Sequence, residues 1–206
     1  MEKVFEKMVE EPIDYKGKKI GMWLFLFTEI LFFGGMFLLY SVFRSRYPID
    51  FHFASREENI ILGSINTAVL LTSSFSIALS ITAIKRGNKN LSSLLQVMTI
   101  VFGAIFLIIK YFEWGAKISL GLYPDSPVLL QQPKGEILFF GLYYVMTGIH
   151  GLHVFIGIIV ISFMLFFTLK EKITRENFAR LENTGLYWHF VDIVWIYLFP
   201  LFYLIP

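Results

Sequence analysis

Five long apolar stretches, separated by short segments rich in charged residues, dominate the sequence. They cover roughly residues 20–42, 60–84, 94–114, 136–169 and 185–205. A helix needs about 20 apolar residues to cross a hydrocarbon core of about 30 Å. The helical periodicity and the absence of strand-length alternation predict spanning helices rather than a β-barrel. The fourth stretch reaches about 50 Å as a continuous helix, so we expect it to tilt or protrude.

Composition supports the same class. Hydrophobic residues make up 56% of the 206 positions, and 23 of them are phenylalanines. The fold class predicted is therefore an all-α polytopic membrane bundle with five transmembrane helices. A net charge of +2 is too small to suggest a nucleic-acid partner. The absence of cysteine excludes a disulfide framework, an iron–sulfur cluster and a cysteine-bridged dinuclear copper site.

The N-terminal segment, residues 1–19, mixes five lysines with five acidic residues, and the apolar run behind it is longer than a signal-peptide core. We interpret it as a solvated or interfacial cytoplasmic tail rather than a cleavable signal. Residues 20–206 contain no evident repeat or low-complexity linker. They are expected to form a single transmembrane domain.

Lysine and arginine residues predict an orientation. With the N-terminus inside, the cytoplasmic segments carry 12 of them and the external segments between the spans carry 5. The positive-inside rule then places the N-terminus in the cytoplasm and the C-terminus outside. An odd number of spans agrees with termini on opposite sides.

Small residues recur every four positions along the second span. They are Ser64, Ala68, Thr72, Ser76 and Ser80. Because small side chains let neighbouring backbones approach, we expect this ridge to pack against another helix.

Ionisable residues within the spans are costly, at about 2.5–3.5 kcal/mol each near the membrane centre. Those in this sequence are Glu29, Lys110, Glu113, His150, His153, His189 and Asp192. Lys110 and Glu113 lie three residues apart near the outer end of the third span, which predicts a neutralised interfacial pair. The others lie in the inner half or the middle, where they could converge between helices.

The two histidines of "GIHGLHV" have competing interpretations. His150 and His153 share a helix face and cannot both be axial ligands of one haem. Either could pair with His189 across helices to hold a b-type haem, and all three could hold a metal ion. Gly148 and Gly151 favour close helix approach, so a structural role in helix packing is the preferred interpretation.

Two acidic residues also leave alternatives open. Glu29 could belong to a proton path, form a helix–helix hydrogen bond or contact a lipid headgroup. Packing or lipid contact is favoured, because a lone acid does not make a path. Asp192 lies three residues after His189 and could accept a hydrogen bond from it.

Five segments, in this order, resemble the subunit III family of haem–copper oxidases over about residues 20–206. They are "WLFLFTEILFF" (23–33), "SINTAVLLTSS" (64–74), "KYFEW" (110–114), "YYVMTGIHGLHVFIG" (143–157) and "YWHFVDIVWIYLFPLFYL" (187–204). The last two are the most specific. The chain is similar to the short, five-helix form of the family.

This resemblance implies a subunit of a cytochrome c or quinol oxidase that reduces oxygen to water and pumps protons. In the family, haems and copper belong to the catalytic subunit I. Subunit III carries no redox cofactor or metal. It lies beside subunit I in a complex that includes subunit II, holds phospholipid, and supports proton uptake and resistance to turnover-linked inactivation. A bacterial plasma membrane is the expected location.

The resemblance assigns lipid-contacting or helix-packing roles, and no catalytic role, to a set of polar positions. They are Glu29, Asn66, Glu113, His150, His153, His189 and Asp192. Many members have two further N-terminal helices, so a complete lipid cleft here requires another subunit to supply the missing wall. Alternative functions are subunit III of a quinol oxidase or of a nitric-oxide-reductase-type complex. More distant alternatives are a b-haem membrane anchor, and a small transporter using Glu29 and Asp192.

Overall fold

The protein is an all-helical bundle. The computed structural model describes the backbone of residues 2–204 and the side chains at position 17 and positions 19–204. The elements are α1 (Glu2–Arg46), α2 (Pro48–Ser55), α3 (Ile60–Lys85), α4 (Lys89–Ser119), the 3₁₀ turn η1 (Leu129–Gln131), α5 (Lys134–Leu169) and α6 (Ala179–Tyr203). No strand occurs among these described residues.

Five of the helices are long and apolar enough to cross a membrane. They are the Lys19–Arg46 part of α1 and the whole of α3, α4, α5 and α6. The predicted class of a five-helix membrane protein is therefore confirmed. The backbone of the predicted tail, residues 1–19, is helical from Glu2 onward. Its side chains, apart from those at positions 17 and 19, lie outside the described residues.

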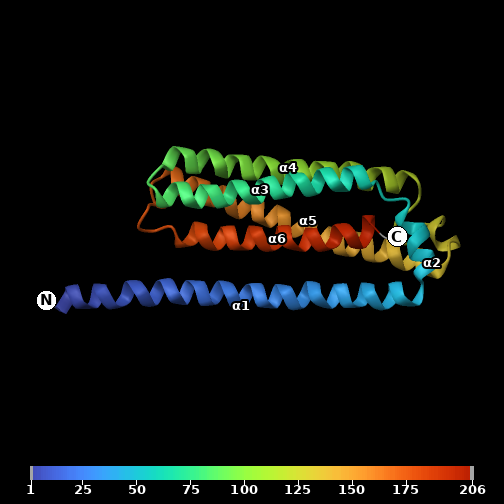
Figure 1. Ribbon diagram of the computed structural model, residues 1–206, viewed down its shortest axis with the longest axis horizontal. Helices are drawn as coiled ribbons and strands as arrows, with labels where there is room; N and C mark the ends of the chain where they lie inside the picture. The colour runs from blue at the N-terminus through green and yellow to red at the C-terminus, as the bar shows by residue number, and fades with distance from the viewer. Residues whose placement is uncertain (1, 205–206) are drawn as a thin grey trace.

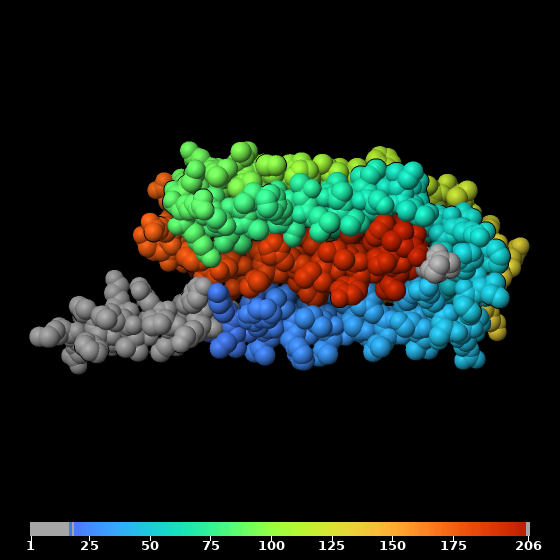
Figure 2. Space-filling model, in the orientation of Figure 1, coloured from blue at the N-terminus to red at the C-terminus, as the bar shows by residue number. Residues whose placement is uncertain are grey.

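Helices α3, α4, α5 and α6 pack together, while α1 lies along one side of this group beside α6 (Figures 1 and 2). In the most apolar 18-residue stretch of α1 only 11% is buried, compared with 56% in the corresponding stretch of α6. Short helix α2 crosses the end of the bundle at which α1 ends (Figure 1). The core therefore centres on α6, and α1 is a peripheral helix.

Close helix packing depends on a tryptophan between two glycines. Trp188 of α6 is fully buried, and its indole Nε1 donates to Ser73 Oγ on α3 at 3.0 Å. A Cβ atom at Gly103 of α4 would lie 2.8 Å from this ring, and one at Gly157 of α5 only 2.6 Å. The two glycines thus form the slot into which the indole fits.

The expected small-residue ridge of α3 is only partly a packing face. Ser76 and Ser80 are buried, but Ser64, Ala68 and Thr72 are exposed. The buried face instead runs through Gly63, Asn66, Leu70, Ser73, Ile77 and Ser80. The four-residue spacing drifts around a helix of 3.6 residues per turn, so the stripe leaves the contact surface toward the start of the helix.

Candidate functional site

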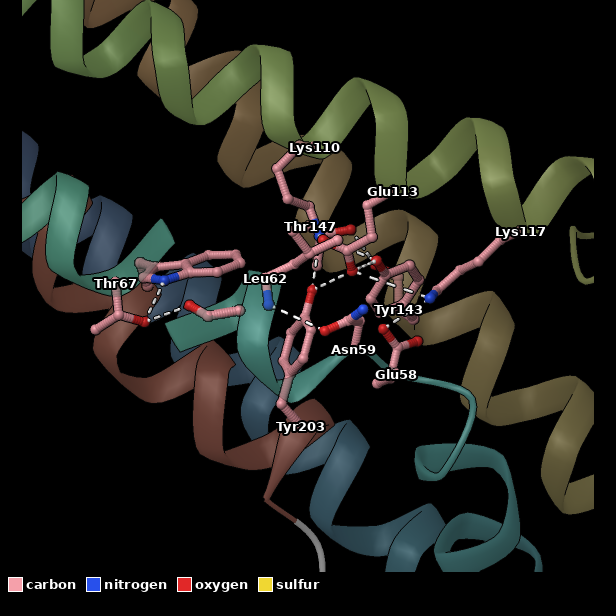
Figure 3. Close-up of polar contacts among 12 residues, drawn as sticks. Glu58, Asn59, Leu62, Thr67, Lys110, Glu113, Lys117, Tyr143, Thr147 and Tyr203 are labelled. Atoms are coloured by element: carbon pink, nitrogen blue, oxygen red, sulfur yellow. Dashed lines mark hydrogen bonds and ion pairs between the residues drawn. The ribbon is translucent and has the colours of Figure 1, made fainter. Parts of the chain in front are cut away.

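Four charged residues form a buried cluster at the end of the bundle that α2 crosses (Figure 3). Lys110 Nζ lies 3.3 Å from Glu113 Oε2, and Lys117 Nζ lies 2.9 Å from Glu58 Oε2. Their side chains are between 0% and 8% exposed. Two positive and two negative groups compensate one another, as burial of charge requires. We call Glu58, Lys110, Glu113 and Lys117 the charged cluster.

Two tyrosines complete the hydrogen bonds of Glu113 and Lys110. The hydroxyls of Tyr143 on α5 and Tyr203 on α6 both donate to Glu113 Oε1, at 2.6 and 2.5 Å. Lys110 Nζ donates to the same two hydroxyl oxygens, at 3.0 and 2.8 Å. Three helices are therefore joined by charge-assisted bonds, which are stronger than neutral ones.

The sequence anticipated only part of this cluster. The predicted pairing of Lys110 with Glu113 is confirmed, but the pair is buried rather than interfacial. Lys117 was missed, although it lies four residues after Glu113 and so on the same helix face. Glu58 was also missed, because it lies in the connection between α2 and α3, where no periodic pattern shows which way a side chain faces.

Glu58 has fewer hydrogen-bond partners than Glu113, the other carboxylate of the charged cluster. Its Oε2 accepts from the Lys117 ammonium group, which lies 2.9 Å away, and this charge-assisted contact joins Glu58 to α4. Burial raises the pKa of Glu58 to about 7, and the positive charge of Lys117 only partly opposes this.

A second polar contact joins α1 to α5. His153 Nε2 lies 3.2 Å from Glu29 Oε2, and its Nδ1 lies 2.8 Å from the Ile149 carbonyl oxygen. A carbonyl only accepts, so Nδ1 carries a proton. Nε2 is then the ring atom that faces the Glu29 carboxyl group, and this contact joins α1 to α5.

This pair lies in a cleft of about 460 Å³ between α1, α5 and α6. Its walls are mostly apolar: Met22, Phe25, Glu29, His153, Ile156, Val160, Asn183, Thr184 and Tyr187. Tyr187 donates its hydroxyl to the His153 carbonyl oxygen at 3.0 Å, which fixes one wall. The cleft is of the size and character that suits an apolar ligand or chain.

The neighbouring histidine faces a different part of the protein. His150 is fully buried, 5.5 Å from the Phe106 ring on α4 and 5.4 Å from the Trp195 ring on α6, measured between ring centroids. Neither ring nitrogen has a hydrogen-bond partner among the described residues. His150 therefore packs against α4 and α6, whereas His153 reaches α1 through Glu29, so the two histidines face different spaces.

The expected bond between His189 and Asp192 is absent. His189 Nδ1 instead lies 2.6 Å from Ser74 Oγ on α3. The Asp192 carboxyl group is buried and also faces Ser74, whereas the amide of Asn66 is buried without a hydrogen-bond partner among the described residues. Although the i, i+3 spacing places His189 and Asp192 on one face of α6, the imidazole hydrogen-bonds to the serine of α3.

A shared metal or haem site would need several of these ligands to face one space. Within the described part of the chain, no group of three or more His, Cys, Asp or Glu side chains is arranged to hold a metal ion. His150, His153 and His189 each contact different neighbours. The arrangement of these side chains joins helices instead.

Comparison with known proteins decides the family. Residues 7–205 match the profile of the family described as Cytochrome c oxidase subunit III. The chain belongs to this family. The resemblance carried by the five sequence segments is thereby confirmed, and the chain is a subunit III of the haem–copper oxidases, which are membrane complexes of the respiratory chain.

Several family members are similar along most of this chain. The cytochrome c oxidase subunit 3 of Thermostichus vulcanus is 32% identical over 190 residues, which cover 90% of this chain and 86% of the relative. The cytochrome bo(3) ubiquinol oxidase subunit 3 of Buchnera aphidicola is 27% identical, with 94% and 89% covered. The heme-copper oxidase subunit I+III of Aeropyrum pernix is 31% identical over 90% of this chain, which spans 22% of that longer protein.

Proposed function

We propose that this chain is an accessory subunit III of a proton-pumping terminal oxidase, with no redox cofactor of its own. The observation that carries the proposal is the engagement of several ionisable groups with other helices of the same chain, as in Glu29 with His153 and Glu113 with Tyr203. Side chains bonded in this way position helices rather than ligate iron or copper.

The partners that follow are the catalytic subunit I, which holds the haems and copper, and subunit II. The name of the Aeropyrum relative combines subunits I and III, which supports a place beside subunit I. From that place the chain supports proton uptake and the stability of the complex during aerobic turnover.

A phospholipid is the ligand proposed for the cleft beside α1. The apolar walls suit an acyl chain, and the polar side chains of Asn183 and Thr184 lie at one end of α6. Replacement of Ile156 by Trp fills the cleft and is expected to lower the number of phospholipids retained, counted by native mass spectrometry of the complex. Leu152→Trp on the exposed side of α5 is the matched control and retains them. Equal lipid counts in both variants contradict this assignment.

The orientation supported by the basic residues has the N-terminus in the cytoplasm and the C-terminus outside, in a bacterial plasma membrane. The start of α1 and the end of α6 lie at opposite ends of the bundle, as this orientation requires (Figure 1). In spheroplasts, added protease is expected to remove a C-terminal tag and to leave an N-terminal tag intact.

Cytochrome c is the proposed electron donor of the complex, with quinol as the alternative because the Buchnera relative is named as part of a ubiquinol oxidase. Oxygen consumption by the purified complex with reduced cytochrome c or with quinol distinguishes them. Consumption of nitric oxide instead of oxygen would indicate a nitric-oxide-reductase-type partner.

Purification through a tag on this chain tests the proposed function. The chain is expected to bring with it a haem- and copper-containing subunit that has oxidase activity. Isolation as a stable complex without such a partner, or a haem spectrum from the chain alone, contradicts the proposal.

A further inference from the structure

His189 is a half-buried side chain near the middle of α6, ten residues after the helix begins at Ala179. At a rise of 1.5 Å per residue it lies about 15 Å along the helix, within the hydrocarbon part of the span. Its Nδ1 lies 2.6 Å from Ser74 Oγ on α3, and its Nε2 has no hydrogen-bond partner among the described residues. One polar atom is therefore left without a partner at a depth where neither water nor lipid headgroups are present.

The hydrogen bonds around Ser74 determine what Nε2 requires. Asp192 also faces Ser74. If the Ser74 hydroxyl donates to the Asp192 carboxyl group, Nδ1 of His189 must donate to Ser74, and Nε2 of the neutral imidazole is an acceptor. If Ser74 donates to Nδ1 instead, Nε2 carries the proton and is a donor. In both arrangements a hydroxyl or an amide group is a suitable partner for Nε2, because each of these groups both donates and accepts.

The surface around His189 is apolar and exposed. Helices α3 and α6 lie side by side at the front of the bundle (Figures 1 and 2). Four exposed apolar side chains flank the bond between His189 and Ser74: Leu71, Phe75, Ile193 and Ile196. We call these four residues together with His189 the α3–α6 face. It combines a broad apolar surface with a single polar atom, as is typical of contacts between membrane helices.

We propose that the α3–α6 face binds a transmembrane helix of a partner subunit of the oxidase, and that this helix presents a hydroxyl or amide side chain to Nε2 of His189. The proposal rests on the proposed function only in requiring a partner subunit in the complex. A protein partner is favoured over lipid, because acyl chains offer no hydrogen bond at this depth. Ionisable side chains within a membrane accordingly face protein rather than lipid.

Other exposed or half-buried polar side chains near the middle of the described spans are bonded within the chain. The hydroxyls of Thr28 and Thr72 donate to carbonyl oxygens of their own helices, and His153 contacts Glu29. The outer side of α4 is apolar at this depth, as at Ile108. The unpaired Nε2 therefore distinguishes the α3–α6 face from these other surfaces.

Photo-crosslinking in the intact membrane complex tests which molecule covers this face. Phe75, next to Ser74, is replaced by the photoreactive residue benzoylphenylalanine, and the equally exposed Phe112 on α4 is the matched control position. Irradiation is expected to join position 75 to a partner subunit, in a product with the summed mass of the two chains. Position 112 is expected to give lipid adducts without this product.

Two variants of His189 test the proposed hydrogen bond. His189→Asn keeps a polar group near the place of Nδ1, where it can still contact Ser74, but has no atom at the place of Nε2. His189→Gln places its amide near the position of Nε2. The association constant between this chain and the rest of the complex is expected to fall about 3- to 20-fold in His189→Asn, the range for one hydrogen bond between membrane helices. It is expected to be retained in His189→Gln.

Lipid adducts alone at position 75, or equal yields of the partner product from positions 75 and 112, overturn the proposal. A product with twice the mass of this chain also overturns it and assigns the face to a second copy. Equal association constants for His189→Asn and His189→Gln contradict the hydrogen bond through Nε2. None of these results changes whether the unmodified chain is purified with a haem- and copper-containing partner, so failure here is distinguishable from failure of the proposed function.

Discussion

Buried polar residues of this protein differ in how fully their hydrogen-bonding groups are satisfied. Glu113 accepts from Tyr143 and Tyr203 and pairs with Lys110, so each of its oxygens has a positive or hydroxyl partner. Asn66 is equally buried, yet neither atom of its amide has a partner among the described residues. Substitutions at these two places should therefore have opposite effects on stability.

Tyr203→Phe removes the hydroxyl that both donates to Glu113 and accepts from Lys110. We expect stability to fall by about 2 kcal/mol, because hydrogen bonds to charged groups contribute about 1.5–3 kcal/mol. The temperature at which this chain dissociates from the heated complex measures the loss. Tyr197→Phe, which removes an exposed hydroxyl from the same helix, is the control and should leave that temperature unchanged.

Asn66→Leu replaces an unpaired buried amide by an apolar side chain of similar size. We expect a gain of about 1 kcal/mol, since a buried polar group without a partner costs about 1–3 kcal/mol. The same dissociation temperature should rise, with oxidase turnover unchanged. A lower temperature would show that the amide forms a bond in the assembled complex, and the assignment of a purely packing role would then be wrong.

The sequence identified the important polar residues, but it did not identify the side chains that they contact. Ionisable residues within apolar spans are rare and conspicuous, so Glu29, Glu113 and His153 could be identified directly. Their partners depend on how each helix is rotated about its axis. His189 contacts Ser74 rather than Asp192, a choice that the spacing within α6 could not reveal.

Close packing of side chains, as well as hydrogen bonds, holds α5 and α6 together. The Trp188 ring fits against Gly157, where no side chain is present to keep the two helices apart. The hydropathy pattern predicted all five spans because burial in a membrane requires long apolar runs. The spacing of small residues gave the packing face of α3 only in part, since Ser76 and Ser80 are buried while Ser64 is exposed. Apolar residues surround each helix and leave little contrast between its sides.

Gly157→Ala is expected to destabilise the contact between α5 and α6 by about 1–3 kcal/mol, a range typical of overpacking. The new Cβ would lie 2.6 Å from Trp188, so the indole or the helix must shift. Gly141→Ala in the same helix is the matched control, because a Cβ there has no atom within 4 Å. Tryptophan fluorescence and the dissociation temperature should change only in Gly157→Ala; equal changes in both variants would contradict the packing account.

The whole molecule consists of a tightly packed group of four helices and a peripheral helix, α1. Contacts such as Glu29 with His153 and Tyr40 with the Leu201 carbonyl hold α1 to this group. A cleft remains between them. The chain belongs to the subunit III family, so it works as part of an oxidase complex. The partners themselves could not be derived from its own residues, since the sequence of one chain does not contain the residues of another.

On the proposed function, the chain stabilises an oxidase without carrying a redox centre. Haem and copper should therefore be measured per catalytic subunit in the complex with and without this chain, together with activity during sustained turnover. We expect identical metal and haem contents, a similar initial rate, and faster inactivation when the chain is absent. Loss of a haem or a copper ion with the chain, or an unchanged inactivation rate, would contradict it.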